Sequence, residues 1–426
     1  MDEARPRVLS VAAGWNASSG QLLKAPLDRL AASGRIEHIF RLSGQAGPAD
    51  IEWADLAVFQ NCQENIDIQT LNWLQRLGRP VIYQTDDYYP DIPSGLLKTR
   101  HFDYPHRKRN YETFLRRADL VFASTSVLAG ALAPYTDRPI VAARVLPVAE
   151  VLLSRPPKYS NDGVFRFVYA ASGANYRHLN NITSGAMRRL AAEYGPKVHF
   201  ILMGGGAVEG LAESFFTTLP RLPLDEYFEV LSGLTVDAGL APLDHSLFSL
   251  CKSDLKFREY GARGVAGLYS QTPVYAGSVV DGQTGLLIPN DEDSWHQAMK
   301  RAVDDPARFR AMGAAARVEV EARMSLSAYA EFWAGDIFPK VEGGLRARKS
   351  DAPPQRAGGL NEAAEMGPAF GPVQKAVYSF SLRLDQLWRK IRTVWYNAFY
   401  LDRYPEVTAL KKTAAGFISL LWRKKC

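Results

Sequence analysis

Three charged side chains between positions 252 and 259 have the types and the spacing to hold a phosphorylated molecule that also carries hydroxyl groups. If a helix begins near Ser253, Lys252 and Lys256 share one face of it, and Glu259 follows three residues later on the same side. Two ammonium groups can neutralise a diphosphate, and a carboxylate can accept hydrogen bonds from a pair of hydroxyls. A solvent-exposed helix with an i,i+3 ion pair has the same spacing, so both interpretations stay open at this point.

Two adjacent carboxylates, Asp86 and Asp87, directly follow the apolar run Pro80–Gln84. If this run is a parallel strand, its carboxyl end faces a cleft, where a carboxylate can accept the proton of a nucleophilic hydroxyl. An Asx turn or a helix cap closed by Pro90 is the structural alternative. His101 lies beyond this loop, as a further catalytic candidate or as a solvated side chain.

A third group of candidates follows the apolar run Phe165–Ala170. Arg177 and His178 could contact phosphate oxygens, because a guanidinium is a planar fork of donors, although a solvated loop explains Arg177 equally well. The run Gly204–Gly206 would let the backbone approach a nucleotide. These glycines do not have the spacing of a dinucleotide or P-loop fingerprint. The chain also lacks the ligand spacings typical of metal sites, so we expect no metal.

The candidate residues lie between apolar runs typical of buried strands and amphipathic runs typical of helices. Continuous apolar strands separated by helices indicate parallel sheets covered on both faces. The pattern stops at the turn-forming stretch 154–163 and then starts again, which predicts an α/β fold with two tandem Rossmann-like domains that face a cleft. We expect domains at 1–155 and 156–345, a flexible linker at 346–372 and a basic, amphipathic helical tail at 373–426.

The expected strands and helices follow from the same patterns. Strands are predicted at 7–13, 36–42, 56–60, 80–84, 120–124, 141–147, 165–170, 199–203, 238–241 and 286–288. Helices are predicted at 21–32, 68–77, 111–117, 128–132, 182–194, 225–232, 256–262, 293–303 and 306–323, the first of them capped by a serine in the loop 14–20.

The composition is that of a globular chain with two or three domains. Of its 426 residues, 47% are hydrophobic and 23% are charged. Cys62, Cys251 and Cys426 are far apart, which argues against a disulfide scaffold and favours a reducing compartment. The N-terminus does not have the pattern of a secretory signal, and no apolar stretch approaches the roughly 20 residues of a transmembrane helix.

The net charge of +6 is unevenly distributed. Residues 373–426 contain eleven Lys or Arg and three Asp or Glu, so the tail carries +8 and the remainder −2. We expect no nucleic-acid partner, because the body has neither a zinc-finger nor an RNP-type pattern. Apolar stripes that include Phe380, Trp395 and Phe417 beside basic residues predict interfacial helices at an anionic membrane surface. The alternative is that the tail packs on the body or on a second protomer, as in a homodimer.

The run GLAPLDHSLFSLCKSDLKFREYGARG at 239–264 is followed by PVYAGSVVDGQTGLLIPND at 273–291 and by Trp295. This order resembles bacterial glycosyltransferases with the GT-B fold, and most of all those that build O-antigen and other surface polysaccharides. YQTDDYYPDIP at 83–93 and RRADLVFASTSVLAGAL at 116–132 are similar to segments of the same group. The likeness extends over roughly residues 7–340 and leaves the tail outside.

The resemblance implies transfer of a sugar from a nucleotide-diphosphate-sugar donor to a cell-surface glycan or lipid-linked acceptor, with no required cofactor. It places Lys252, Ser253 and Lys256 near the diphosphate and the sugar, and Glu259 on the ribose hydroxyls. The other donor contacts that it implies are Ser172, Gly173, Arg177, His178, Gly204, Arg221 and Tyr275, while Gly14, Ser19 and Gly20 would border the acceptor and the diphosphate. Cys251 stands where many retaining members carry the first of two Glu, which leaves the donor sugar and the anomeric outcome open.

With its tail, the sequence predicts a peripheral enzyme at the cytoplasmic face of the inner membrane. A degenerate GT-B domain that binds a glycan or a partner without catalysis is the alternative. A GT-B sugar-nucleotide epimerase would explain the donor residues but not the tail.

Overall fold

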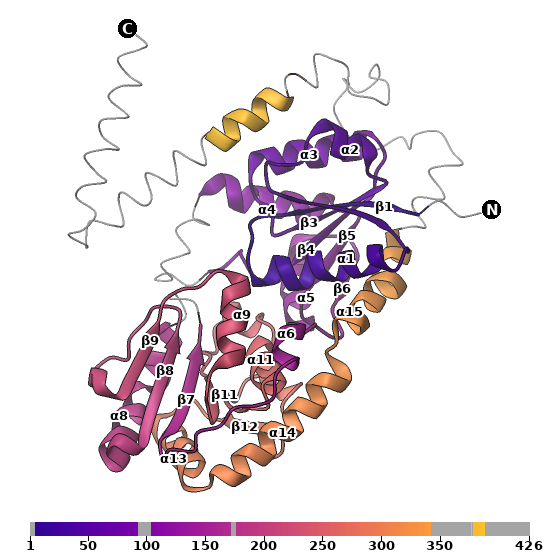
Figure 1. Ribbon diagram of the computed structural model, residues 1–426. Helices are drawn as coiled ribbons and strands as arrows, with labels where there is room; N and C mark the ends of the chain where they lie inside the picture. The colour runs from indigo at the N-terminus through magenta and orange to yellow at the C-terminus, as the bar shows by residue number, and fades with distance from the viewer. Residues whose placement is uncertain (1–4, 93–103, 172–175, 342–375, 377, 388–426) are drawn as a thin grey trace.

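The computed structural model of the chain describes residues 5–92, 104–171, 176–341, 376 and 378–387. Figure 1 shows two lobes, each built around one sheet, and a long helix that runs along the lower lobe toward the upper one. The strands of both sheets are parallel, as the continuous apolar runs predicted.

The upper lobe contains a sheet in the order β2-β1-β3-β4-β5-β6. Its strands are β1 (Arg7–Ala12), β2 (Glu37–Leu42), β3 (Leu56–Gln60), β4 (Val81–Thr85), β5 (Leu120–Ala123) and β6 (Ile140–Ala142). The helices are α1 (Ala25–Ala32), α2 (Pro48–Trp53), α3 (Asn65–Arg76), α4 (Pro105–Arg117) and α5 (Ser126–Leu132). Leu71 and Phe114 pack on one face of the sheet and Leu27 on the other, which explains why every residue of β3 and β4 is buried.

The lower lobe contains a sheet in the order β12-β11-β10-β7-β8-β9. Its strands are β7 (Phe165–Ala170), β8 (Val198–Met203), β9 (Phe216–Leu219), β10 (Ala238–Ala241), β11 (Ala266–Ser270) and β12 (Gly285–Ile288). The helices are α6 (Glu150–Leu153), α7 (Tyr176–His178), α8 (Ser184–Tyr194), α9 (Leu224–Gly233), α10 (Leu247–Leu250), α11 (Leu255–Ala262), α12 (Pro273–Ala276), α13 (Glu292–Asp304) and α14 (Pro306–Arg323). Leu190 and Met299 of α8 and α13 pack on one face, and Phe257 and Val320 of α11 and α14 pack on the other.

Each lobe receives segments from the other half of the chain. After α14, helix α15 (Leu326–Phe332) returns to the upper lobe, where Trp333 packs edge-on against Phe122 with ring centroids 5.0 Å apart. Leu146 belongs to the core of the upper lobe, whereas Val148 already belongs to that of the lower lobe. The chain therefore passes from the core of the upper lobe to that of the lower lobe between residues 146 and 148, whereas the turn-rich composition predicted a boundary at residue 155.

Several elements differ from the sequence-based expectation. Strands β9 and β11, and helices α2 and α15, were not predicted. β11 contains Gly267, which weakens a strand pattern, but a Cβ at this position would lie 2.1 Å from the ring of Tyr269. The first helical segment begins at Ala17, inside the predicted loop. Its cap is Asn16, whose side chain accepts from the backbone N–H of Ser19 at 3.0 Å, and not a serine as expected.

The first part of the tail is a helix over residues 378–387 that packs on the upper lobe (Figure 1). Tyr378 is buried, and its hydroxyl bonds to Thr70 Oγ1 at 2.5 Å and to the backbone oxygen of Ala46 at 3.2 Å. The other face presents Phe380 and Leu387, which are 62% and 54% exposed. The predicted linker lies outside the described residues, as does most of the tail. Within the described residues, no helix combines the length and the hydrophobicity that crossing a bilayer requires.

Candidate active site

A cavity of about 210 Å³ lies between the two lobes, where the carboxyl ends of both sheets meet. The upper lobe contributes the loops after β1 and β4, and the lower lobe contributes the ends of β7 and β10 and the segment before α11. The sequence-predicted residues that line it are Asp86, Asp87, His178, Lys252, Ser253, Lys256 and Tyr275. Side chains nominated from separate parts of the sequence therefore meet in one place.

Asp86 is held by two neighbours from adjacent strands of the upper sheet. Ser18, in the first turn of the helical segment that follows β1, donates its hydroxyl to Asp86 Oδ2, and Asn61, directly after β3, donates its amide to Oδ1. Asn61 has a φ of +53°, the one positive value at a non-glycine residue in the described part of the chain. Burial, and then the charge of Asp87, raises the pKa of the Asp86 carboxyl above its ordinary value. Asp86 is thus an oriented carboxylate with increased proton affinity.

Asp87 contacts the opposite lobe. Lys252 Nζ lies 3.2 Å from Asp87 Oδ1 and 4.3 Å from the centroid of the Phe248 ring. Phe248 and Cys251 are buried in the core cluster of the upper lobe, although they belong to the chain segment of the lower one. The Lys252–Asp87 ion pair therefore bridges the cavity, and an anionic ligand that bound Lys252 would compete with Asp87 for it.

Lys256 and Glu259 form the i,i+3 ion pair that was one of the two interpretations of this segment. The pair is not on the surface, because Glu259 is only 2% exposed and Lys256 lines the cavity. Tyr227 of α9 donates its hydroxyl to Glu259 Oε2 at 2.9 Å. Helix α11 begins at Leu255, so Lys252 precedes the helix instead of sharing its face, but it reaches the same cavity.

Arg258 positions this segment and was missed in the sequence. It is buried, donates to Asp254 Oδ1 at 3.0 Å and to Ser253 Oγ at 3.2 Å, and also donates to the backbone oxygen of Pro147. The cavity-lining Ser253 is thereby tied to the connection between the lobes. An arginine inside the charged run KFRE has no sequence signal that separates it from a solvated one.

The remaining donor candidates lie at different distances from this cavity. Burial lowers the pKa of His178 to about 4 against the opposing charge of Asp244, so its imidazole is neutral near pH 7. Arg177 forms an ion pair with Asp244 at 3.1 Å and does not line the cavity.

Gly204 lies at the carboxyl end of β8, and its backbone N–H donates to the backbone oxygen of Leu219 at 3.0 Å. Arg221 is exposed just beyond β9, and neither residue lines the cavity. Ser172, Gly173 and His101 lie outside the described residues.

The segment after β1 reaches the cavity through Ser18, in the first helical turn, and not through the residues that the resemblance implied. Ser19 is buried and its hydroxyl is engaged with Asn16, while Gly14 is half-buried and has no neighbour within 4 Å of an added Cβ. Gly20 lies against α9 of the other lobe, where a Cβ would come within 2.9 Å of Leu224. A side chain at position 20 would therefore require the terminal methyl group of Leu224 to move.

Cys251, at the position of the first Glu of many retaining relatives, is fully buried. Burial, followed by the nearby Asp87, raises the pKa of its thiol to about 11, so it is uncharged near pH 7. In the described part of the chain, no group of three or more His, Cys, Asp or Glu side chains could hold a metal ion.

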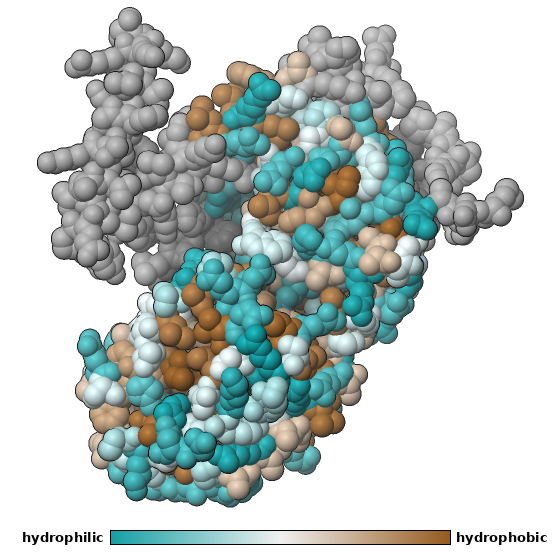
Figure 2. Space-filling model, in the orientation of Figure 1, coloured by the Kyte–Doolittle hydropathy of each residue, from teal (hydrophilic) through white to brown (hydrophobic). Residues whose placement is uncertain are grey.

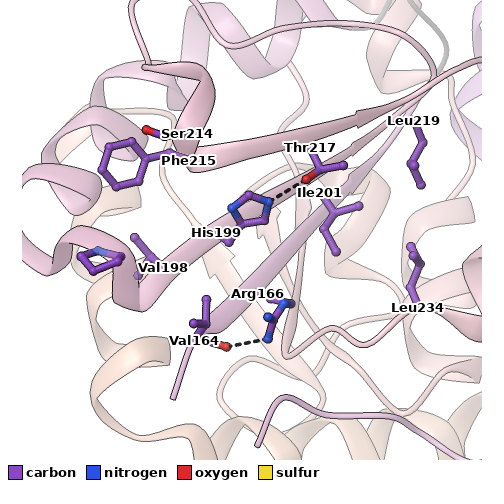
Figure 3. Close-up of a pocket in the computed structure, with 11 residues that line it drawn as sticks. Val164, Arg166, Val198, His199, Ile201, Ser214, Phe215, Thr217, Leu219 and Leu234 are labelled. Carbon is purple, nitrogen blue, oxygen red and sulfur yellow. Dashed lines mark hydrogen bonds between the residues drawn. The ribbon is translucent and has the colours of Figure 1, made fainter. Parts of the chain in front are cut away.

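A cavity of about 590 Å³ lies elsewhere, on the outer face of β7, β8 and β9 (Figure 3). Figure 2 shows apolar side chains gathered over this part of the lower lobe. His199 bonds to Thr217 at 2.9 Å, and Arg166 forms an ion pair with Asp162 at 2.7 Å, so its polar groups satisfy one another. None of the predicted site residues lines this cavity, and it is not the candidate site.

Comparison with known proteins identifies solved structures with a similar fold. Neither a protein-family model nor a curated protein sequence matches the chain. HepE from Anabaena, solved in complex with UDP-glucose, is similar over 78% of this chain and 99% of its own, with a TM-score of 0.55 and 13% identity. The sucrose-phosphate synthase from Thermosynechococcus elongatus is similar over 80% of this chain and 100% of its own, with a TM-score of 0.53 and 13% identity. A glycosyltransferase from Rickettsia africae has the same TM-score at 12% identity, over 81% of this chain and 100% of its own.

At these identities the similarity concerns the fold alone. This chain has two six-stranded parallel sheets flanked by helices, and its overall arrangement matches these structures over about four fifths of its length. The chain therefore has the two-domain GT-B fold that the sequence resemblance predicted.

Proposed function

We propose that the protein is a glycosyltransferase that moves a sugar from a nucleotide-diphosphate-sugar donor to a hydroxyl of an acceptor. The observation that carries this proposal is the cavity between the lobes, where Lys252 and Lys256 of one lobe face Asp86 and Asp87 of the other. Cations on one side suit a diphosphate leaving group, and carboxylates on the other suit an attacking hydroxyl. A pure binding module has no need for the second set.

On this proposal the donor binds to the lower lobe. Lys252 and Lys256 neutralise the diphosphate, and Glu259 accepts hydrogen bonds from the ribose hydroxyls. In the free protein, Lys256 Nζ forms an ion pair with Glu259 and Lys252 Nζ forms one with Asp87. A bound donor would attract both ammonium groups toward its phosphates. Because these cations can stabilise the departing diphosphate, the proposed reaction requires no metal or other cofactor.

The acceptor approaches from the upper lobe, with Asp86 as the base. The acceptor oxygen forms a bond to the anomeric carbon while the bond from that carbon to the diphosphate oxygen breaks. The nucleoside diphosphate leaves with the electron pair, and Asp86 takes the proton of the hydroxyl. Its raised pKa favours this transfer, and Ser18 and Asn61 keep the carboxylate in place.

We further propose that the acceptor is a cell-surface glycan or a lipid-linked precursor, modified at the cytoplasmic face of the inner membrane. Two observations support this assignment: the charge of +8 on residues 373–426, and the exposed Phe380, Leu384 and Leu387 on the described part of the tail. Cationic and aromatic residues together favour an anionic lipid surface. HepE was solved with UDP-glucose, so uridine nucleotides are the first donors to test.

The test is a panel of nucleotide sugars, in which thermal stabilisation and slow donor hydrolysis are measured for the wild-type protein and for Asp86→Asn. A glycosyltransferase should be stabilised by at least one donor and should hydrolyse it, and Asp86→Asn should retain the stabilisation and lose the turnover. Stabilisation without any turnover, also in the presence of glycan acceptors, would indicate the non-catalytic module. The absence of stabilisation by every nucleotide would refute both.

A further inference from the structure

A second cavity between the lobes, of about 360 Å³, lies next to the candidate active site. It is formed by the carboxyl ends of β5 and β6 in the upper lobe, and by α12 and the end of α14 in the lower lobe. Lys252 lines both this cavity and the candidate active site. The two cavities are therefore adjacent and share Lys252, whose ammonium group we assign to the donor diphosphate. The volume lies within the range of about 300–1,000 Å³ typical of small-molecule sites.

One buried polar group in this cavity has no partner. Ser124, directly after β5, is 4% exposed, and its hydroxyl makes no hydrogen bond to any described residue. Buried polar side chains are bonded in the large majority of cases, because an unmet hydroxyl loses its hydration without compensation. The neighbouring Thr125 is satisfied in the free protein, since it accepts from Leu128 N at 3.1 Å and donates to Cys251 O at 3.2 Å. Ser124 thus offers a hydrogen bond that no described residue takes and that a bound ligand can accept or donate.

The charges around the cavity favour an anion. Its lining contains Arg144, Lys252 and Arg323 against one carboxylate, Asp254. That carboxylate is already engaged by Arg258 at 3.0 Å and by the hydroxyl of Ser278, so its charge is compensated.

The two arginines have only exposed ion-pair partners, and Arg144 also lies over the ring of Phe332, 5.2 Å from its centroid. Arg144 pairs with Asp336 and Arg323 with Glu319, both in ion pairs at least 30% exposed on each side. Exposed pairs of this kind contribute little and are readily exchanged for a better partner. Each guanidinium also has five N–H donors, so it can bind a second anion without leaving the first.

We infer that this cavity is the acceptor subsite, and that the acceptor carries a phosphoryl group which Arg144, Arg323 and Ser124 bind. The inference rests on the proposed function and deepens it, because it names the chemical class of the acceptor. Two oxygens of one phosphate match the guanidinium fork, and a third can accept from the serine hydroxyl. A sugar phosphate and a sugar on an isoprenyl diphosphate present the same group, and the test separates these two sources.

The test measures the affinity of glucose 1-phosphate and of glucose by calorimetry, in the presence of saturating nucleoside diphosphate. The wild-type protein should bind glucose 1-phosphate at least about tenfold more tightly than glucose, as one or two charge-assisted hydrogen bonds predict. Arg323→Gln and Ser124→Ala should each reduce this preference, while Arg308→Gln should leave it unchanged. Arg308 is the matched control, since it is an exposed arginine on the same helix α14 and lies outside the cavity.

Ser124→Ala also separates ligand binding from a structural effect. Because the hydroxyl has no protein partner in the free protein, its removal should leave the melting temperature unchanged or slightly higher while the preference for glucose 1-phosphate decreases. A lower melting temperature would show that the hydroxyl serves the fold, which contradicts the inference.

The second arm uses a sugar linked to a long isoprenyl diphosphate in detergent micelles. If this molecule binds in an Arg323-dependent manner and glucose 1-phosphate does not, the phosphoryl group belongs to a lipid-linked acceptor. If neither binds, or if Arg323→Gln binds both as the wild type does, the subsite inference is wrong. The proposed function fails separately, in the case that no nucleoside diphosphate binds at all.

Discussion

Replacing Glu259 by glutamine should weaken the binding of nucleoside diphosphates through the ribose alone. Glu259 Oε2 accepts from Tyr227 at 2.9 Å and from Lys256 in the free protein. A glutamine oxygen can still accept a hydrogen bond from Tyr227 or from Lys256, so the variant should fold although the counter-charge of Lys256 is lost, whereas alanine would remove both acceptor atoms as well. The amide offers the ribose diol one acceptor atom in place of two.

The magnitude follows from the bonds that are lost. A hydrogen bond to a charged group contributes about 1.5–3 kcal/mol, which is an affinity change of about 10- to 150-fold. The assay is calorimetry with the tightest-binding nucleoside diphosphate and with its 2′,3′-dideoxy analogue, on the wild type, on Glu259→Gln and on Glu226→Gln. Glu226 is an exposed glutamate on α9, next to Tyr227 in sequence, and serves as the matched control.

The comparison of ligands makes the result specific to the ribose contact. The wild type and Glu226→Gln should lose affinity when both ribose hydroxyls are removed, and Glu259→Gln should lose less, because one of its two acceptor atoms and the negative charge are already gone. Equal binding of the ribo and dideoxy ligands by the wild type would refute the ribose assignment. An equal loss for both ligands in Glu259→Gln would show that the glutamate acts by positioning Lys256 instead.

Three further variants give testable outcomes. Asp86→Asn should reduce the transfer rate about 100-fold or more at nearly unchanged donor affinity. Burial and the charge of Asp87 raise the pKa of Asp86, so the ionised carboxylate lowers the stability of the folded protein once the pH exceeds the ordinary pKa of an aspartate. Asp86→Asn removes this charge and should therefore have a higher melting temperature than the wild type at pH 7. A lower melting temperature would contradict this reasoning. Burial would raise the pKa of Asp55, but hydrogen bonds from Arg7 outweigh burial and lower it. Chemical denaturation should therefore show that Asp55→Asn is less stable than the wild type at pH 7, and that this difference in stability shrinks as the pH falls. A stability difference that does not change with pH would show that the ion pair does not contribute. A chain ending at Leu387 loses nine of the eleven basic residues of the tail and should no longer sediment with anionic vesicles. Equal sedimentation would locate membrane binding in the body or in the docked helix that the variant keeps, with its exposed Phe380 and Leu387.

Local patterns along the chain were sufficient for the architecture. β3, β7 and β10 have the bounds that their apolar runs predicted, since a strand buried on both faces shows its burial in every residue. The strands that were missed have weaker local signals. β11 contains a glycine that a tyrosine ring covers, and β9 is a half-exposed edge strand. Their pairing partners, not their own residues, make them strands.

The sequence by itself determined that Lys256 and Glu259 would lie close enough to pair, because an i,i+3 spacing within one helix brings two side chains together. Only the tertiary structure decided what surrounds Asp86 and Asp87. Ser18 and Asn61 are 68 and 25 residues from Asp86 along the chain, and Lys252 is 165 residues from Asp87. The order of the strands brings Ser18 and Asn61 to the same carboxyl end of the sheet as Asp86. The packing of the two lobes brings Lys252 to Asp87. The pKa of Asp86 and the adjacency of the two cavities depend on these long-range contacts, and periodicity along the chain contains no information about which loops meet.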